Sequence, residues 1–453
     1  MSRKFKKPDY EMALNQAITL REALPANHLA RFVVMVTGQL DLSHIYARYA
    51  LVGGEAIAPE ILLGLLFYGY ATGVFSSRKM EKATYENIPF RFIASGLHPD
   101  HDTIANFRKT FLAEIQELFV QILLLAKLAG LLKLGNISVD GSKIHADASK
   151  SKAVSYKRLG ELETQLRQEV HELLELGEQA DQGALQLPEG LVVEDEIAIR
   201  KEWLENLVSA RVVLEARAQE RHAAEQAEYD AKLRDREEEA KRSERKPRGR
   251  KPKPPEVGPK DKDQYNFTDP DSRIMKNSTD DGFDQHYNVQ AAVDQESLLI
   301  VAPALSNHPN DKQEAEPTLD AISPKVGKPT AAALDNGYFS EANVTALERR
   351  GIDPYIATGR EPHHKSWHSF FDELPEPAED ASLQVKMAYK LQTKIGQAVY
   401  RLRKCTVEPV IGIIKEVLGF RQFSLRGLVA AAGEWCLVCL AFNLKRMHVL
   451  MVG

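Results

Sequence analysis

Residues 136–144 read NISVDGSKI, a short run of β-branched and apolar residues that ends in small polar ones. β-branched side chains suit a pleated, half-buried surface, so this stretch predicts a β-strand. Asp140 stands inside it. A carboxylate in an apolar strand is costly unless another group compensates its charge, which makes Asp140 a candidate functional residue.

The chain before this strand has the spacing of helices. Apolar residues recur at three- and four-residue intervals in Glu60–Tyr70 and in Phe107–Leu132. Asp102 and Thr103 are candidate N-caps for a helix over residues 104–111. We therefore expect residues 1–135 to form an all-helical N-terminal domain.

A charged segment interrupts the strand pattern after residue 150. Residues 151–245 are dominated by Glu, Lys, Arg, Ala and Leu, with a break that contains Gly and Pro at 177–190. Two helices joined by a turn predict a charged helical hairpin of the coiled-coil type, which could clamp DNA, pair subunits or simply be solvated. A basic, Pro-rich linker ends this insertion, which covers residues 151–263.

Strand signals resume at residue 264. The predicted strands are 286–293, 298–305, 330–334 and 353–357, and the predicted helices are 311–322, 340–350, 381–396, a segment from Tyr400 that includes 408–418, and 428–449. Together with residues 136–144, these strands indicate an α/β domain with a five-stranded mixed sheet. That domain would consist of residues 136–150 and 264–453.

Length and composition limit the class of protein. The chain has 453 residues, a net charge of −5 and no apolar signal region after its basic start, so we expect a cytoplasmic protein of several domains. Because the whole chain is not cationic, nucleic-acid binding would depend on local basic patches. Cys436 and Cys439 lie in an apolar helical run, and we expect two buried thiols there rather than zinc ligands.

Three acidic residues occupy informative positions on the predicted elements. Asp140 lies on the first strand, Asp335 at the end of the fourth, and Glu408 on a helix after the fifth. Asp335 could instead close a turn, and Glu408 before Pro409 could be a first-turn helix carboxylate. The order of the three on strand, strand and helix favours a shared site, and carboxylate oxygens suit Mg²⁺ or Mn²⁺.

These motifs resemble those of DDE transposases of bacterial insertion sequences, whose catalytic domain has a ribonuclease-H-like fold. The resemblance covers nearly the whole chain. It rests on the motifs VDGSKIHAD (139–147), DPDSR (269–273), HYNVQAAV (286–293), LDNGYFS (334–340) and EPVIGIIK (408–415). Related transposases carry a signature of Tyr, two residues, Arg, three residues, Glu, six residues and Lys. Tyr400 and Arg403 match its first spacing and Glu408 and Lys415 its last, but four residues separate Arg403 from Glu408.

The resemblance implies that Asp140, Asp335 and Glu408 bind two Mg²⁺ or Mn²⁺ ions per active site. Hydrolysis of a strand at the transposon end would be followed by attack of the freed 3′-OH on target DNA. Lys415 would hold a phosphate or a terminal base, with a solvated surface lysine as the alternative. A homodimer on DNA is also implied, because two ends must be brought together. A nuclease of the same fold without strand transfer and an inactive DNA-binding relic are the competing hypotheses.

Three basic patches are candidate DNA contacts, because phosphate contacts by Lys and Arg dominate DNA affinity. One, at 246–255, is similar to an AT-hook for a narrow minor groove, one precedes Glu408, and one lies on a short helix that could be a recognition helix. The residues are Arg248, Arg250 and Lys251 in the first patch, Tyr400, Arg401, Arg403 and Lys404 in the second, and Thr103, Asn106, Arg108 and Lys109 in the third. Solvated basic surface is the alternative for each patch. His363, His364 and His368 are expected in a surface loop.

Overall fold

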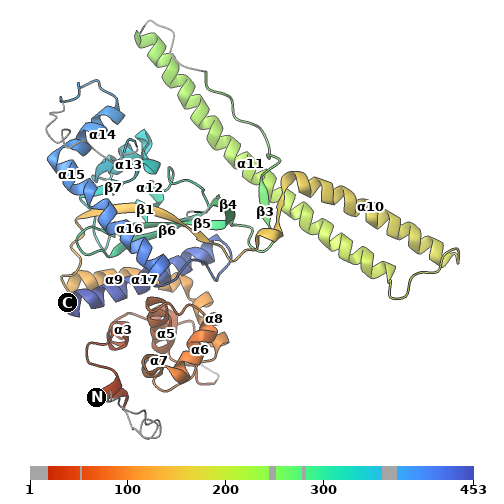
Figure 1. The fold of residues 1–453 in the computed structure, drawn as a ribbon, viewed down its shortest axis with the longest axis horizontal. Helices are drawn as coiled ribbons and strands as arrows, with labels where there is room; N and C mark the ends of the chain where they lie inside the picture. Colours follow the sequence, from red (N-terminus) through yellow and green to blue (C-terminus); the bar gives the residue numbers. More distant parts are fainter. Residues whose placement is uncertain (1–18, 51–53, 244–250, 278–281, 360–374, 453) are drawn as a thin grey trace, which may run out of the picture. The chain divides into compact units, whose positions relative to one another are not determined.

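A mixed β-sheet carries Asp140 (Figure 1). The computed structural model describes residues 19–50, 54–243, 251–277, 282–359 and 375–452. The central strand β1 pairs antiparallel with β5 and parallel with β7, β8 follows β7, and both β4 and β6 pair with β5. The strands of this sheet are β1 (Asn136–His145), β4 (Arg273–Lys276), β5 (Phe283–Asp294), β6 (Ile300–Ser306), β7 (Ala331–Leu334) and β8 (Asp353–Ile356).

The prediction of an α/β fold with a mixed sheet is confirmed, but the predicted number of strands is wrong. All five predicted strands are present with shifted ends, and β4 is a sixth strand of the sheet. It has only four residues, which is too short to show a clear alternation in sequence. A separate two-stranded sheet, β2 (Ala153–Ser155) with β3 (Gln264–Asn266), was not predicted either.

The structure divides into two compact units. One unit contains the chain up to Asp147 and from Met275 onward, and the other is Ala148–Ile274. The helices before residue 135 belong to the same unit as the main sheet, and a domain boundary at that point stays a prediction. These helices are α2 (Leu20–Ala23), α3 (Leu29–Thr37), α4 (Ser43–Tyr46), α5 (Pro59–Ala71), α6 (Ser77–Glu86), α7 (Ile88–Ile93), α8 (His101–Thr110) and α9 (Leu112–Leu128).

The C-terminal helix α17 (Leu428–Val452) connects the N-terminal helices with the sheet, because it packs against α5, α9 and β6. Trp435 is fully buried, and its indole N–H donates to the backbone oxygen of Gln290 on β5 (3.0 Å). Cys436 and Cys439 are buried free thiols, as predicted. Among the described helices, α17 is long and apolar enough to cross a membrane, but 72% of its most apolar window is buried in the protein. That burial is typical of a core helix.

Two long helices form most of the second unit. The helices α10 (Tyr156–Asp181) and α11 (Val193–Ser243) pack against each other through Leu159, Leu207 and Leu214. Arg211 on α11 pairs with Glu163 on α10. The apolar seam and the ion pair explain why this charged sequence forms a pair of helices rather than an extended chain.

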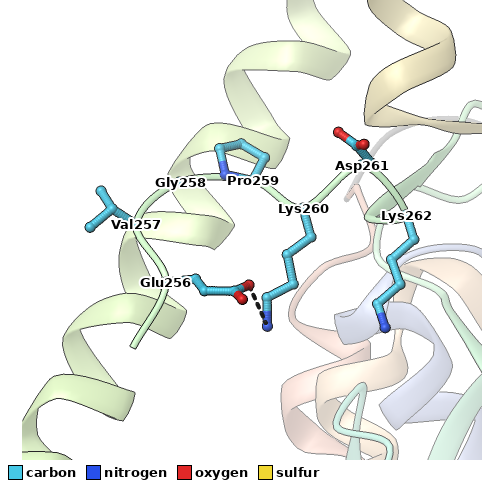
Figure 2. A pocket seen from close by; sticks show the side chains of 7 residues that line it. All are labelled: Glu256, Val257, Gly258, Pro259, Lys260, Asp261 and Lys262. Atoms are coloured by element: carbon cyan, nitrogen blue, oxygen red, sulfur yellow. Dashed lines mark ion pairs between the residues drawn. The ribbon is translucent and has the colours of Figure 1, made fainter. Parts of the chain in front are cut away.

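The segment Glu256–Lys262, which lies between α11 and β3 in the sequence, lines a shallow hollow of about 810 Å³ in the second unit (Figure 2). Glu256 and Lys260 form an ion pair across it, with 3.8 Å between Oε2 and Nζ. Arg221 of α11 holds the segment by donating to the backbone oxygen of Gly258 (3.1 Å) and to the Asp263 carboxylate (2.9 Å). The lining has mixed charge and none of the three predicted acidic-site residues, so we assign it no chemistry.

The remaining helices of the sheet-bearing unit follow β6. The predicted helix over 311–322 is shorter than expected and leaves Asp311 in the turn before it. The helix α16 contains Pro409 in its interior and continues into a π-helical segment, η4, of a kind often found at functional sites. The bounds are α12 (Ala315–Asp320), η2 (Asn336–Tyr338), α13 (Glu341–Arg349), α14 (Leu383–Gln392), α15 (Lys394–Arg401), α16 (Arg403–Gly412) and η4 (Ile413–Val417).

Candidate active site

Asp140 and Asp335 lie at the same end of two neighbouring strands. In the parallel pair of β1 and β7, Val139 is opposite Leu334, so each aspartate directly follows a paired residue. β7 ends there, whereas β1 continues along β5 to His145. Asp140 and Asp335 therefore lie side by side where β7 ends and β1 no longer has a partner strand on that side.

Arg403 joins Asp140 to Glu408. Its guanidinium donates from Nη1 to Asp140 Oδ2 (3.0 Å) and from Nη2 to Glu408 Oε1 (3.1 Å). α16, which begins at Arg403, packs on β1 (Figure 1). Arg403 is 7% exposed, so the guanidinium is a buried positive charge between two members of the predicted acidic triad.

The environment of Asp140 raises the pKa of its carboxyl despite this partner. Burial raises the pKa of the Asp140 carboxyl to about 6, the Arg403 charge opposes the rise, and the Asp335 carboxylate adds to it. Two aspartates that face each other in a partly buried site repel one another unless a cation lies between them. The site therefore has more negative charge than Arg403 alone compensates.

Asp335 both closes a turn and faces the site. Its Oδ1 accepts from the backbone N–H of Gly337 (2.7 Å), which caps η2. The turn alternative is thus correct as a description of local structure, and the Asp335 carboxylate also lies near enough to Asp140 to raise the pKa of that carboxyl.

Glu408 is not a first-turn helix residue. α16 begins at Arg403, so Glu408 and Pro409 stand in the helix interior, and Glu408 is about half exposed (47%). Because Pro409 has no N–H, it cannot donate a backbone hydrogen bond inside the helix. The first-turn alternative for Glu408 is wrong, and its carboxylate instead faces Arg403.

Lys415 contacts β1 next to Asp140. Its ammonium lies 3.1 Å from Ser142 Oγ and 3.4 Å from the backbone oxygen of Lys143. Burial lowers the pKa of Lys415. Lys415 is thus a half-buried lysine at the rim of the acidic site, which does not match the alternative of a fully solvated surface lysine.

Tyr400 and Arg403 come together although they lie on successive helices. The Arg403 guanidinium carbon lies 5.9 Å from the centre of the Tyr400 ring, and Tyr400 packs beside Val399 on an apolar cluster under β7 and β8. The signature residues therefore meet despite the extra residue before Glu408. Arg403 is buried inside the acidic site, and its predicted contact with a DNA phosphate stays a prediction.

The short helix α8 requires a correction. Arg108 is buried: it donates to the Tyr70 hydroxyl (2.7 Å) and lies 3.8 Å from the Glu434 carboxylate of α17. Its assignment as a DNA contact is therefore wrong, because the amphipathic pattern of a short helix does not reveal which basic side chain faces the core. Asn106 and Lys109 are exposed.

The N-cap of α8 also differs from the prediction. Asp100, rather than Asp102 or Thr103, caps the helix, and its Oδ1 accepts from the backbone N–H of Thr103 (2.7 Å). Of the other predicted DNA contacts, Lys404 and Lys251 are exposed. Arg248, Arg250, His363, His364 and His368 lie outside the described residues.

The oxygen donors can be compared with what a divalent cation requires. Within the described residues, no three His, Cys, Asp or Glu side chains converge closely enough to form a ready metal cluster. The geometry explains this, because the Arg403 guanidinium stands between Asp140 and Glu408 as the resident cation. The donor set of the predicted triad is all carboxylate, which is the ligand type that hard divalent cations prefer.

Comparison with protein families gives two matches. A transposase domain (DUF772) matches residues 18–110, and a transposase DDE domain matches residues 262–444. The chain belongs to the DDE transposases. The two matches cover more than half of the chain, and they imply a ribonuclease-H-like fold for its catalytic part. Comparison with curated proteins and with solved structures returns no match.

The matched DDE range begins after Asp140. The first strand of this transposase, β1, lies upstream of residue 262, and the residues of the second compact unit follow it in the sequence, before β5. The pairing of β1 with β5 and β7 restores it to the centre of the sheet. Asp140 is therefore connected to the DDE domain by structure and not by the family match.

Proposed function

We propose that Asp140, Asp335 and Glu408 are the catalytic carboxylates with which this transposase cleaves the ends of its element and joins the 3′-OH to target DNA. One observation carries the proposal: β1 and β7 set Asp140 and Asp335 side by side, and Arg403 ties Glu408 to the same place. Carboxylates grouped at the ends of two strands and on one helix are a suitable support for phosphoryl transfer.

Asp140, Asp335 and Glu408 would hold two divalent cations, Mg²⁺ or Mn²⁺. When bound, such ions activate the attacking oxygen and neutralise charge on the scissile phosphate. Asp140 takes up a cation only after it loses its proton, and burial makes that proton harder to lose. Arg403 keeps Asp140 and Glu408 in position while the negative charge of the site is uncompensated.

DNA contacts follow from the basic side chains around this site. Lys415 and Lys404 stand on the same helical stretch as Glu408, and Asn106, Lys109 and Lys251 offer contacts elsewhere on the described chain. Lys415 would bind a phosphate near the reacting strand, because its ammonium lies beside Ser142 on β1. We propose a cytoplasmic protein that acts as a homodimer on two transposon ends.

Strand cleavage of a labelled duplex that carries the end of the element tests the proposal. The variants are Asp140→Asn, Asp335→Asn and Glu408→Gln, with Glu416→Gln as the control because it removes an exposed acid about two helical turns beyond Glu408. In Mg²⁺ or Mn²⁺, the wild type and the control should nick the end and join it to target. The three triad variants should bind the duplex without cutting it.

Other outcomes select the competing hypotheses. Nicking without any joined product would indicate a nuclease of the same fold. Binding of the end by the wild type without cleavage in either metal would indicate a DNA-binding relic. Cleavage by all three triad variants at the wild-type rate would show that the active site lies elsewhere.

A further inference from the structure

A buried polar network lies directly behind the two aspartates. Gln290 on β5 is opposite Gly141 of β1 and is fully buried. Its Nε2 donates to Asp311 Oδ1 (2.8 Å), and its Oε1 accepts from the Tyr338 hydroxyl. Both ends of the amide are therefore used, which holds the side chain in one orientation.

Asp311 is the acceptor on which this network converges. The same Oδ1 also accepts from Asn288 Nδ2 (2.8 Å), so one carboxylate oxygen satisfies two buried amides. The Lys143 ammonium lies 3.9 Å from that oxygen and has no hydrogen-bond partner among the described residues. Asp311 thus supplies the negative charge next to a partly buried lysine of β1.

Two glycines bring the network close to the acidic site. Gly141 follows Asp140, and a Cβ at that position would lie 2.8 Å from Asp311 Oδ1. Gly337, whose N–H holds Asp335, would place a Cβ 3.8 Å from Asp311. A side chain at position 141 would therefore have to displace the network, because real Cβ atoms do not approach a heavy atom below about 3 Å, whereas a Cβ at position 337 would be in ordinary contact with Asp311.

Tyr338 completes the connection. It is the last residue of η2, the turn that Asp335 caps, and it is fully buried. The hydroxyl–Gln290 contact therefore links the turn behind Asp335 to the strand opposite Asp140. Asp311, in the turn before α12, accepts a hydrogen bond from the same Gln290 side chain, so three separate segments of the chain meet there.

We propose that Asp311 is a positioning residue for the transposase reaction. Through Gln290 it fixes the backbone at Gly141 and Gly337, and so the separation of the Asp140 and Asp335 carboxylates. This inference rests on the proposed function, in which those two aspartates act together. Asp311 need not touch DNA or metal to have this effect.

The test compares Asp311→Ala with Asp311→Asn in the full-length protein. An Asn oxygen can still accept both amide hydrogen bonds, whereas Ala leaves Asn288 and Gln290 without an acceptor. Glu316→Gln is the matched control, because Glu316 is an exposed acid on α12 that pairs with Arg350. The measurements are kcat and KM for cleavage of the labelled end, together with the thermal midpoint of each variant.

We expect Asp311→Ala to lower kcat by about tenfold to a hundredfold with KM changed less than about twofold, since small misplacements of catalytic groups have effects of this size. Asp311→Asn should recover most of the rate, and Glu316→Gln should match the wild type. Wild-type kcat in a folded Asp311→Ala protein would overturn the inference. So would equal loss in the Asn and Ala variants, because the charge itself would then be required.

A second variant covers the case in which Asp311→Ala does not fold. Gly141→Ala keeps the Asp311 carboxylate but places a Cβ too close to both the Gln290 amide and Asp311 Oδ1, so it should disrupt their hydrogen bond and lower kcat in the same way. Wild-type kcat in Gly141→Ala would overturn the inference. Asp140→Asn separates the two hypotheses. If that variant cleaves like the wild type, the proposed function fails, whereas an inactive Asp140→Asn with a fully active Asp311→Ala removes only the positioning role.

Discussion

The replacement Arg108→Met should destabilise the protein without a direct effect on DNA contacts. The Arg108 guanidinium donates to the Tyr70 hydroxyl (2.7 Å) and to the backbone oxygen of Phe75 (3.2 Å), and it forms an ion pair with the buried Glu434 (3.8 Å). Methionine fills a similar volume but leaves the Glu434 carboxylate buried without a counter-charge.

The magnitude follows from the contacts that remain. Removal of one partner from a buried ion pair costs about 3–5 kcal/mol. Glu434 would keep the Tyr70 hydroxyl and the backbone N–H groups of Ser424 (2.9 Å) and Leu425 (3.0 Å), so we expect the lower end, about 3 kcal/mol. The double variant Arg108→Met with Glu434→Gln should recover part of this loss, because no buried charge is then unpaired.

Urea unfolding followed by tryptophan fluorescence measures the effect, since Trp435 lies one residue from Glu434 in α17. Lys109→Met is the control: it removes an exposed charge from the same helix and should change the free energy of unfolding by less than about 0.5 kcal/mol. If Arg108→Met unfolds like this control but loses affinity for the transposon end, the structural account of Arg108 is wrong and the original DNA-contact prediction is restored.

Four further results are expected. Burial lowers the pKa of His286 to about 4 in the folded state, so the unfolded state binds the proton first as pH falls. The protein should therefore lose about 3 kcal/mol of its free energy of unfolding between pH 6.5 and pH 4. In urea unfolding measured across this pH range, His286→Gln should remove most of that loss. Arg403→Gln should tighten Mn²⁺ binding in the absence of DNA by about tenfold, ~1.4 kcal/mol, because the guanidinium no longer pairs with Asp140 and Glu408. Replacement of the exposed Arg401 by Gln should leave the affinity unchanged. An unchanged Mn²⁺ affinity of Arg403→Gln, measured by electron paramagnetic resonance, would refute this. Lys415→Met should weaken end binding and lower the slope of log affinity against log salt by about one unit, measured by fluorescence anisotropy. Chelation of divalent metal should abolish cleavage and leave end binding intact in a mobility-shift assay, with activity restored by Mg²⁺ or Mn²⁺.

Local patterns predicted the elements of this protein well. NISVDGSKI forms β1, and Ser340 caps α13 by accepting from the backbone N–H of Asn343 (3.1 Å), because caps and β-branched runs act over a few residues. The sequence pattern did not predict β4, which is very short. It also placed the start of a helix at Asp311, where the structure has a turn before α12.

The residue types of the acidic site could also be found in the sequence, because the carboxylates stand on recognisable elements in a recognisable order. Their partners could not. Arg403 is 263 residues from Asp140 in the chain, and Glu434 is 364 residues from Tyr70, so nothing in the local sequence links them. Strand register and helix packing choose such partners, and this choice depends on the whole sheet.

The same reason explains why the sequence did not predict that Arg108 is buried. A basic residue on a short helix looks alike in sequence whether it faces water or a buried acid. Residue chemistry and local spacing are properties of the chain itself, and they were sufficient to identify the transposase family and to predict which carboxylates form its acidic site. Burial and long-range pairing exist only after folding, and they place Arg108 in the core, Arg403 between Asp140 and Glu408, and Asp311 behind both aspartates.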